Sequence, residues 1–186
     1  MKFSLAPHPT TNPDAISAVA VEIARLAPDQ LALRYEVEGD IARLLAPAPA
    51  HPERTDELWK HTCFEAFLMT PAGGGYLECN LSPSSQWAVY AFDAYREGMR
   101  AAEGFSPAIS IEGSAERFAL SATLRGPALA RGGPLALCAV IEETDGRKSY
   151  WALRHPPGKP DFHHPDCFAA ELGASEALRL QGGADG

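Results

Sequence analysis

FEAFLM at residues 64–69 and YLECNL at residues 76–81 are the two stretches that decide the fold. The segment TPAGGG, residues 70–75, lies between them and is rich in turn-forming residues. If Met69 faces Tyr76, the two stretches form an antiparallel hairpin in which each residue has a cross-strand partner. A slip of one residue would mix apolar and polar side chains on both faces, so their separation favours this register. The predicted apolar face consists of Phe64, Ala66, Leu68, Leu77, Cys79 and Leu81.

The other face of the predicted hairpin carries most of its polar chemistry. Glu65 is expected opposite Asn80, and Glu78 diagonally from Glu65, roughly 7–8 Å away by sheet geometry. Phe67, Met69 and Tyr76 complete this face. Carboxylates and amides hydrogen-bond to hydroxyl groups, and aromatic rings stack on the apolar faces of sugars. This face therefore suits a polyhydroxylated ligand, and the alternative is a solvated outer face with a few exposed aromatic rings.

Aromatic residues concentrate on both sides of the hairpin. Trp59 and Trp87 are candidate walls of a ligand slot, although at least one of them is expected in the core. Arg96 is expected to pair with Glu65 or Glu78, either as a ligand clamp or as a structural ion pair. The candidate ligand-binding residues are thus Trp59, Glu65, Glu78, Asn80, Trp87 and Arg96.

The rest of the chain repeats the two-residue period of β-strands. Residues 31–37 and 118–124 alternate between apolar and polar side chains, and Ile109 and Ile111 mark a shorter strand. Residues 135–141 are apolar at both odd and even positions. Both faces of such a strand would be buried, which predicts a strand in the middle of a sheet. Residues 18–26 fit either a strand or a helix. Together these patterns predict an all-β fold, an antiparallel β-sandwich of jelly-roll or immunoglobulin-like type. One domain is expected over residues 1–180, followed by a flexible tail at 181–186.

Composition limits the partners. The chain has 186 residues and a net charge of -8, and it has no cluster of Lys and Arg, so we expect no binding to nucleic acid. No apolar stretch approaches the roughly 20 residues of a membrane helix, so no membrane association is expected. Prolines interrupt residues 1–14 where a signal peptide needs an apolar run, which predicts a cytoplasmic protein. The four cysteines are too sparse for a disulfide scaffold. Nothing in these patterns indicates an oligomeric state.

Metal, haem and catalysis are the alternative functions. His163 and His164, close to Cys167, are the candidate metal ligands, and His61 and Cys63 form a second loose group, but neither spacing matches a compact zinc motif. For haem, Met69 would have to act with His163 or His164. Glu65 and Glu78 could form a glycosidase pair, yet the chain has no motif typical of an enzyme. We therefore expect no resident cofactor and favour a non-catalytic protein.

Two blocks of sequence resemble a known family. LWKHTCFEAF at 58–67, with YLECNLSP at 76–83 and WAVYAFD at 87–93, is similar to the bacterial DOMON-like proteins, which are related to carbohydrate-binding module family 9. YWALRHP at 150–156 and PDFHHPDCF at 160–168 are similar to the closing segment of the same group. The resemblance extends in outline over residues 16–172. It implies a β-sandwich that binds a carbohydrate or amino-sugar-like ligand, or haem as in some DOMON domains.

Overall fold

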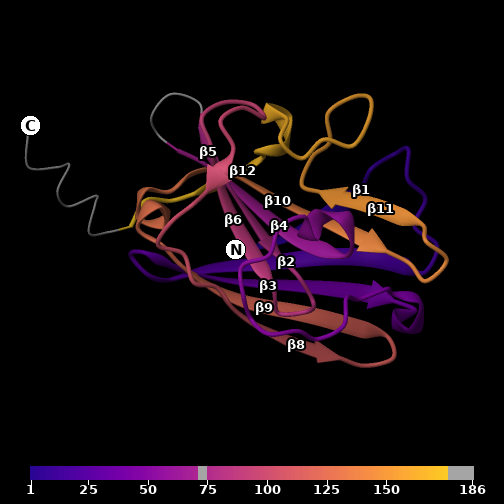
Figure 1. Ribbon diagram of the computed structural model, residues 1–186. Coiled ribbons are helices and arrows are strands. Elements are labelled where there is room, and N and C mark those ends of the chain that lie inside the picture. Colours follow the sequence, from indigo (N-terminus) through magenta and orange to yellow (C-terminus); the bar gives the residue numbers. More distant parts are fainter. Residues whose placement is uncertain (71–74, 176–186) are drawn as a thin grey trace, which may run out of the picture.

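The protein is described by a computed structural model that covers residues 1–70 and 75–175. The predicted tail at 181–186 lies outside these residues. The described chain contains no α-helix, which confirms the all-β prediction (Figure 1). Its strands are β1 (Lys2–Pro7), β2 (Ile16–Ala27), β3 (Gln30–Gly39), β4 (Cys63–Met69), β5 (Tyr76–Leu81), β6 (Trp87–Phe92), β7 (Arg100–Ala101), β8 (Ala108–Gly113), β9 (Arg117–Arg125), β10 (Gly133–Glu142), β11 (Lys148–Ala152) and β12 (Ala170–Leu172). The short 3₁₀ helices are η1 (Ile41–Arg43), η2 (Leu58–Lys60), η3 (Pro127–Arg131) and η4 (Pro165–Cys167). None of these helical segments is long or apolar enough to cross a membrane.

The strands form one strongly curled sheet in the order β7-β6-β5-β4-β10-β11-β1-β2-β3-β9-β8, with β12 added beside β10. All pairings between these named strands are antiparallel. Strand β1 joins the two halves, because Lys2 to Leu5 pair with β2 whereas Ala6 and Pro7 pair with β11. The curl brings the β2–β3–β9–β8 half against the β4–β5–β10 half, as Figure 1 shows.

The main core lies between these two halves. Phe64 of β4 stacks on Phe118 of β9 and packs against Tyr35 of β3, so one cluster joins strands from both halves. The Tyr35 hydroxyl donates a 2.7 Å hydrogen bond to the backbone oxygen of Glu65. This bond fixes the position of β4 relative to the opposite half of the sheet.

The hairpin has the predicted register. Met69 pairs with Tyr76, Glu65 with Asn80 and Phe64 with Leu81. The structure also decides two other segments. Residues 18–26, for which a strand and a helix were both open, belong to strand β2. Residues 135–141 belong to β10, which lies between β4 and β11, as predicted for a strand in the middle of a sheet.

The second face of the hairpin is not a solvated surface. Glu65, Glu78 and Asn80 are 3%, 4% and 0% exposed. The segment after β11 folds back over them and, together with η2, builds a second apolar cluster on this face. That cluster contains Phe67, Tyr76, Tyr90, Phe92, Cys138, Phe162 and Cys167, with Trp59, Tyr150 and Phe168 packed at its margin. The polar side chains of the hairpin therefore lie at a covered surface.

Candidate functional site

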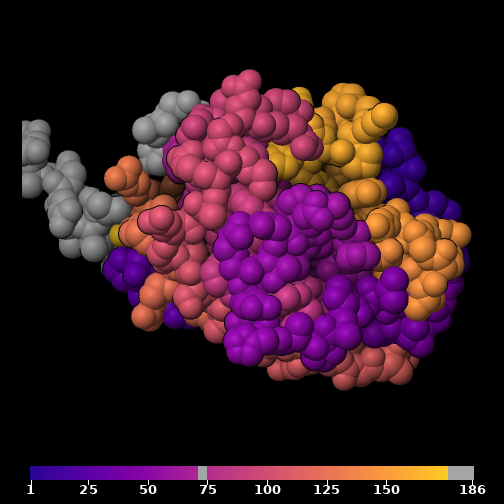
Figure 2. All heavy atoms as spheres, in the orientation of Figure 1, coloured from indigo at the N-terminus to yellow at the C-terminus, as the bar shows by residue number. Residues whose placement is uncertain are grey.

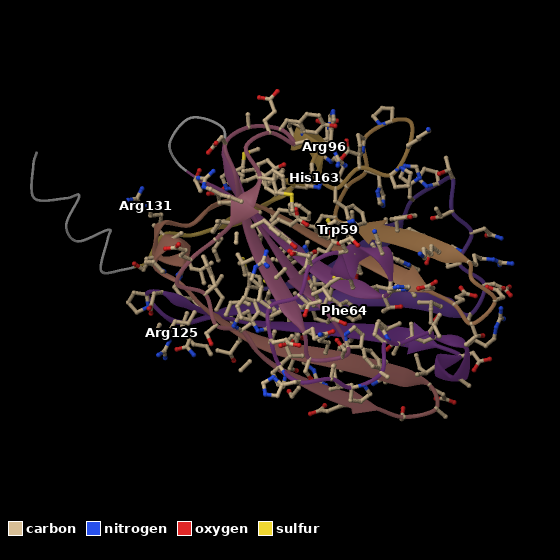
Figure 3. The ribbon with its side chains drawn as sticks, viewed as in Figure 1. Trp59, Phe64, Arg96, Arg125, Arg131 and His163 are labelled. Atoms are coloured by element: carbon tan, nitrogen blue, oxygen red, sulfur yellow. The ribbon has the colours of Figure 1, made fainter. Side chains whose placement is uncertain are left out.

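A cavity of about 330 Å³ lies on the second face of the hairpin. Its volume is at the small end of the range for ligand pockets, so it suits a small molecule rather than a long polymer. Figure 3 shows Trp59, His163 and Arg96 gathered on the side of the sheet away from the β8–β9 half. The side chains that line the cavity come from η2, β4, β5, β6, β10, β11 and two loops: Trp59, Glu65, Glu78, Phe92, Arg96, Met99, Val140, Tyr150, Pro160, Asp161, Phe162 and His163.

Glu65 and Glu78 form a buried acidic pair at this cavity. Glu78 accepts a 2.7 Å hydrogen bond at Oε1 from the Asn80 amide, whereas Glu65 Oε1 is buried without a partner among the described residues. Burial raises the pKa of the Glu65 carboxyl well above its usual range, and the nearby Glu78 raises it further. Burial also raises the pKa of Glu78, although the Asn80 hydrogen bond and Arg96 oppose this shift. The pair therefore holds protons more tightly than exposed carboxyls do.

Arg96 has a partner that the sequence did not predict. Its guanidinium Nη2 lies 2.7 Å from Asp161 Oδ1, rather than in an ion pair with Glu65 or Glu78. Asp161 also accepts hydrogen bonds from the Tyr95 hydroxyl and from the backbone N–H of His163. Burial alone would raise the pKa of Asp161, but the hydrogen bonds from Tyr95 and Arg96 outweigh it, and the pKa falls. Asp161 thus remains an anion that balances the charge of Arg96.

Arg96 is held in an unusual backbone conformation. Its φ of 57° places a residue other than glycine in the left-handed region. Its backbone N–H donates a 3.1 Å hydrogen bond to the hydroxyl of Tyr76. Tyr95 and Arg96 form a turn between Ala94 and Glu97, which pair in an isolated β-bridge, and such turns commonly require this conformation.

His163 connects the loop to the hairpin. Its Nδ1 lies 2.7 Å from the Tyr76 hydroxyl and its Nε2 lies 3.8 Å from Glu78 Oε2. Burial lowers the pKa of His163 to about 4, and Arg96 contributes in the same direction. The imidazole is therefore neutral at pH 7. The Tyr76 hydroxyl accepts from the Arg96 N–H, so its own proton is available for Nδ1; in the tautomer that accepts it, the imidazole proton lies on Nε2 and faces Glu78.

Two of the predicted ligand-binding residues lie away from the cavity wall. Asn80 is fully buried behind the wall, where it holds Glu78. Trp87 pairs with Leu81 and packs against the main core, on the opposite side of the sheet from Glu78. The structure thus brings Trp59, Glu65, Glu78 and Arg96 to one cavity and leaves Trp87 outside it. As anticipated for at least one of the two tryptophans, Trp87 packs against the core.

Several residues of the cavity were not predicted from the sequence as ligand-binding residues. Asp161 and Phe162 come from the loop after β11, Tyr150 from β11 itself, and Phe92 from β6. The PDFHH run at 160–164 was the available signal, because an acid, an aromatic ring and two histidines lie together between prolines. The sequence alone does not place this run over the hairpin.

The two predicted metal ligands lie in different surroundings. His163 is part of the cavity, whereas His164 accepts a 3.2 Å hydrogen bond from the backbone N–H of Asp166 and caps η4. Across residues 1–70 and 75–175, no three His, Cys, Asp or Glu side chains are grouped closely enough to hold a metal ion. His164 thus has a local structural role in the turn before Phe168.

A larger hollow of about 690 Å³ lies over β1, β2, β3, β9 and β8, on the other half of the sheet. Its lining contains no aromatic side chain, and its Arg34 is already held by Glu36 and Glu112. None of the buried unpartnered polar atoms in the described chain belongs to its lining, whereas Glu65 lines the smaller cavity. The smaller cavity is therefore the better candidate site.

Comparison with known proteins supports the fold. No family model and no curated protein matches the chain. A crystal structure of a Bacteroides uniformis protein, proposed to be a carbohydrate-binding protein, is similar with a TM-score of 0.63. The sequences are 15% identical, and the match covers 90% of this chain and 83% of the other. At this identity the comparison shows a shared all-β fold, and the ligand has to be argued from the site.

Proposed function

We propose that the chain is a non-catalytic binding module that holds a carbohydrate or amino-sugar-like molecule in the cavity above the hairpin. The observation that carries the proposal is the combination of an unpartnered buried carboxyl, Glu65, with aromatic side chains around one small cavity. The similarity to a Bacteroides uniformis protein proposed to bind carbohydrate supports the same ligand class. The proposal also takes the curled sheet to be a DOMON-like β-sandwich, as the sequence resemblance implies.

Each part of the cavity has a role in this proposal. Trp59 and Tyr150 provide flat apolar surfaces for the C–H faces of a sugar ring. Glu65 and Glu78 accept or donate hydrogen bonds to hydroxyl groups, according to their protonation. Arg96, oriented by Asp161, adds further donors at the rim. A ligand hydroxyl bonded to Glu65 would remove the cost of an unsatisfied buried oxygen.

The three tryptophans allow a direct test. Trp59 lines the cavity, Trp87 packs against the main core, and the buried Trp151 donates its indole N–H to Ser149 Oγ at 2.9 Å. In a titration with a panel of mono- and disaccharides followed by NMR, the Trp59 indole signal should shift first. Trp59→Ala should remove binding, whereas Trp87→Phe, the matched control, should retain it. No shift of the Trp59 indole with any sugar of the panel would refute the proposal.

Catalysis is the second candidate, because one specific observation favours it. A carboxyl whose pKa is raised by burial can serve as a general acid, and Glu65 with Glu78 forms such a pair. A panel of chromogenic glycosides tests this function. Turnover that Glu65→Gln abolishes would replace the proposal of a non-catalytic module with that of a glycosidase.

A further inference from the structure

The cavity has more acidic than basic groups. Glu65, Glu78 and Asp161 contribute three carboxyls to its lining, and Arg96 contributes the guanidinium. Arg96 is engaged by Asp161 at 2.7 Å, and its guanidinium also lies over the ring of Tyr95. The charge of Arg96 is thus balanced by Asp161, and the other basic side chain of the lining, His163, is neutral at pH 7. Neither Glu65 nor Glu78 is paired with a positively charged side chain of this lining.

Arg96 lowers the pKa of both Glu65 and Glu78, but its ion pair is with Asp161. Within the described parts of the chain, neither glutamate forms an ion pair with Lys or Arg, and His163 Nε2 lies 3.8 Å from Glu78. This imidazole is neutral at pH 7, as argued above, so it supplies a dipole rather than a charge. Since ionised buried carboxyls without a paired cation are costly, Glu65 and Glu78 hold protons that a positive group could replace.

The walls of the cavity also suit a positive group. Trp59, Phe92, Tyr150 and Phe162 surround the glutamates from η2, two strands and the loop after β11. The negative face of an aromatic ring attracts a cation, and the attraction increases when the cation is desolvated. An acidic floor with aromatic walls is therefore complementary to an organic cation in shape and in charge.

We propose that the ligand of this cavity carries an ammonium group, which lies between Glu65 and Glu78 and contacts the surrounding aromatic rings. This inference rests on the proposed function for the location of the site and adds the charge of the ligand. An ammonium group has three N–H donors, so it can satisfy the unpartnered Glu65 Oε1 and the free oxygen of Glu78 together. A single hydroxyl group donates only one hydrogen bond and carries no charge, so it cannot balance two ionised carboxylates.

Pairs of probes that differ in charge test this inference. Cyclohexylamine is compared with cyclohexanol, and glucosamine with glucose, by isothermal titration calorimetry at pH 7. The amine of each pair should bind at least tenfold more tightly than its neutral counterpart. Glu65→Gln and Glu78→Gln keep the side-chain shape without the charge, and each should reduce this preference severalfold. Glu112→Gln, an exposed glutamate paired with Arg34 on the other half of the sheet, should retain it.

The outcomes separate this inference from the proposed function. Sugars that bind with equal affinity whether or not they carry an amine would overturn the ammonium inference and leave carbohydrate binding intact. Cyclohexylamine that binds when both sugars fail would support an ammonium ligand and remove the carbohydrate. Failure of both amines to bind the wild-type protein would refute the inference, and this result does not depend on whether the variants fold.

Discussion

Replacing Glu65 by glutamine should change how the stability of the protein depends on pH. The side chain is 3% exposed, and its pKa is raised well above the ordinary value of 4.5 because burial disfavours the charged form. The folded state therefore binds the proton more tightly than the unfolded chain does. The stabilisation from this proton is fully present below the ordinary carboxyl pKa and is lost as the pH rises through the raised pKa.

The size of the effect follows from this linkage. Between the ordinary and the raised pKa, one such group removes at most about 1.4 kcal/mol of stability per pH unit. Two pH units inside this window amount to about 2.7 kcal/mol at most. Glu65→Gln removes the titration of this group. The free energy of unfolding of the variant, relative to that of the wild type, should therefore increase as the pH rises. Because Glu78 lies nearby and is also shifted, the two groups titrate as a pair.

Urea unfolding followed by tryptophan fluorescence, from pH 4.5 to pH 8, measures this difference. Glu65→Gln and Glu78→Gln should each flatten the pH dependence, and the double variant should be the flattest. Glu112→Gln, whose side chain is 69% exposed, is the matched control and should follow the wild-type curve. Curves for Glu65→Gln and the wild type that remain parallel over this range would show that the buried carboxyl does not hold its proton as argued here.

Three further predictions concern the fold. Glu143 is fully buried, accepts hydrogen bonds from the backbone N–H groups of Asp14 and Ala15, and pairs with Arg43, so Glu143→Ala should destabilise the protein by about 3 kcal/mol in urea unfolding. Tyr35→Phe removes the hydrogen bond to the Glu65 backbone oxygen and should cost about 1–2 kcal/mol by the same measurement; no loss would mean that water replaces the hydroxyl. All four cysteines are buried, and burial raises the pKa of Cys167 to about 12, so a thiol reagent at pH 7 should react rapidly only after denaturation. Rapid reaction of the native protein would indicate frequent local opening.

The hairpin was predictable because its signal is local. Strands β4 and β5 are separated by six residues, and the two-residue period of their side chains fixes which residues share a face. The same register places Glu65 and Glu78 on one face, so the position of the two glutamates followed from pairing alone. The long strands β3 and β9 were predictable for the same reason.

What could not be predicted depends on contacts distant in the sequence. Strand β1 has a single buried residue, Leu5, and ends at a proline, yet it joins the two halves of the sheet by pairing with β2 and β11. The partner of Arg96 is Asp161, 65 residues further along the chain. Loop residues carry no periodic pattern, so the sequence analysis paired Arg96 with Glu65 or Glu78 and missed Asp161.

The position of the site follows from how the curled sheet uses its two faces. One face of β4 and β5 packs in the main core, where Phe64 contacts the opposite half of the sheet. The other face would expose Phe67 and Tyr76, and the loop after β11 covers them with Phe162 and His163. This cover, part of the yellow and orange surface at the upper right of Figure 2, does not fill the cavity that Glu65 lines. Two buried carboxyls at the floor of an unfilled cavity reduce the stability of the fold at neutral pH. A core formed for stability alone would place apolar side chains at Glu65 and Glu78, and the ammonium ligand proposed above would supply the charge and the hydrogen bonds that these carboxyls lack.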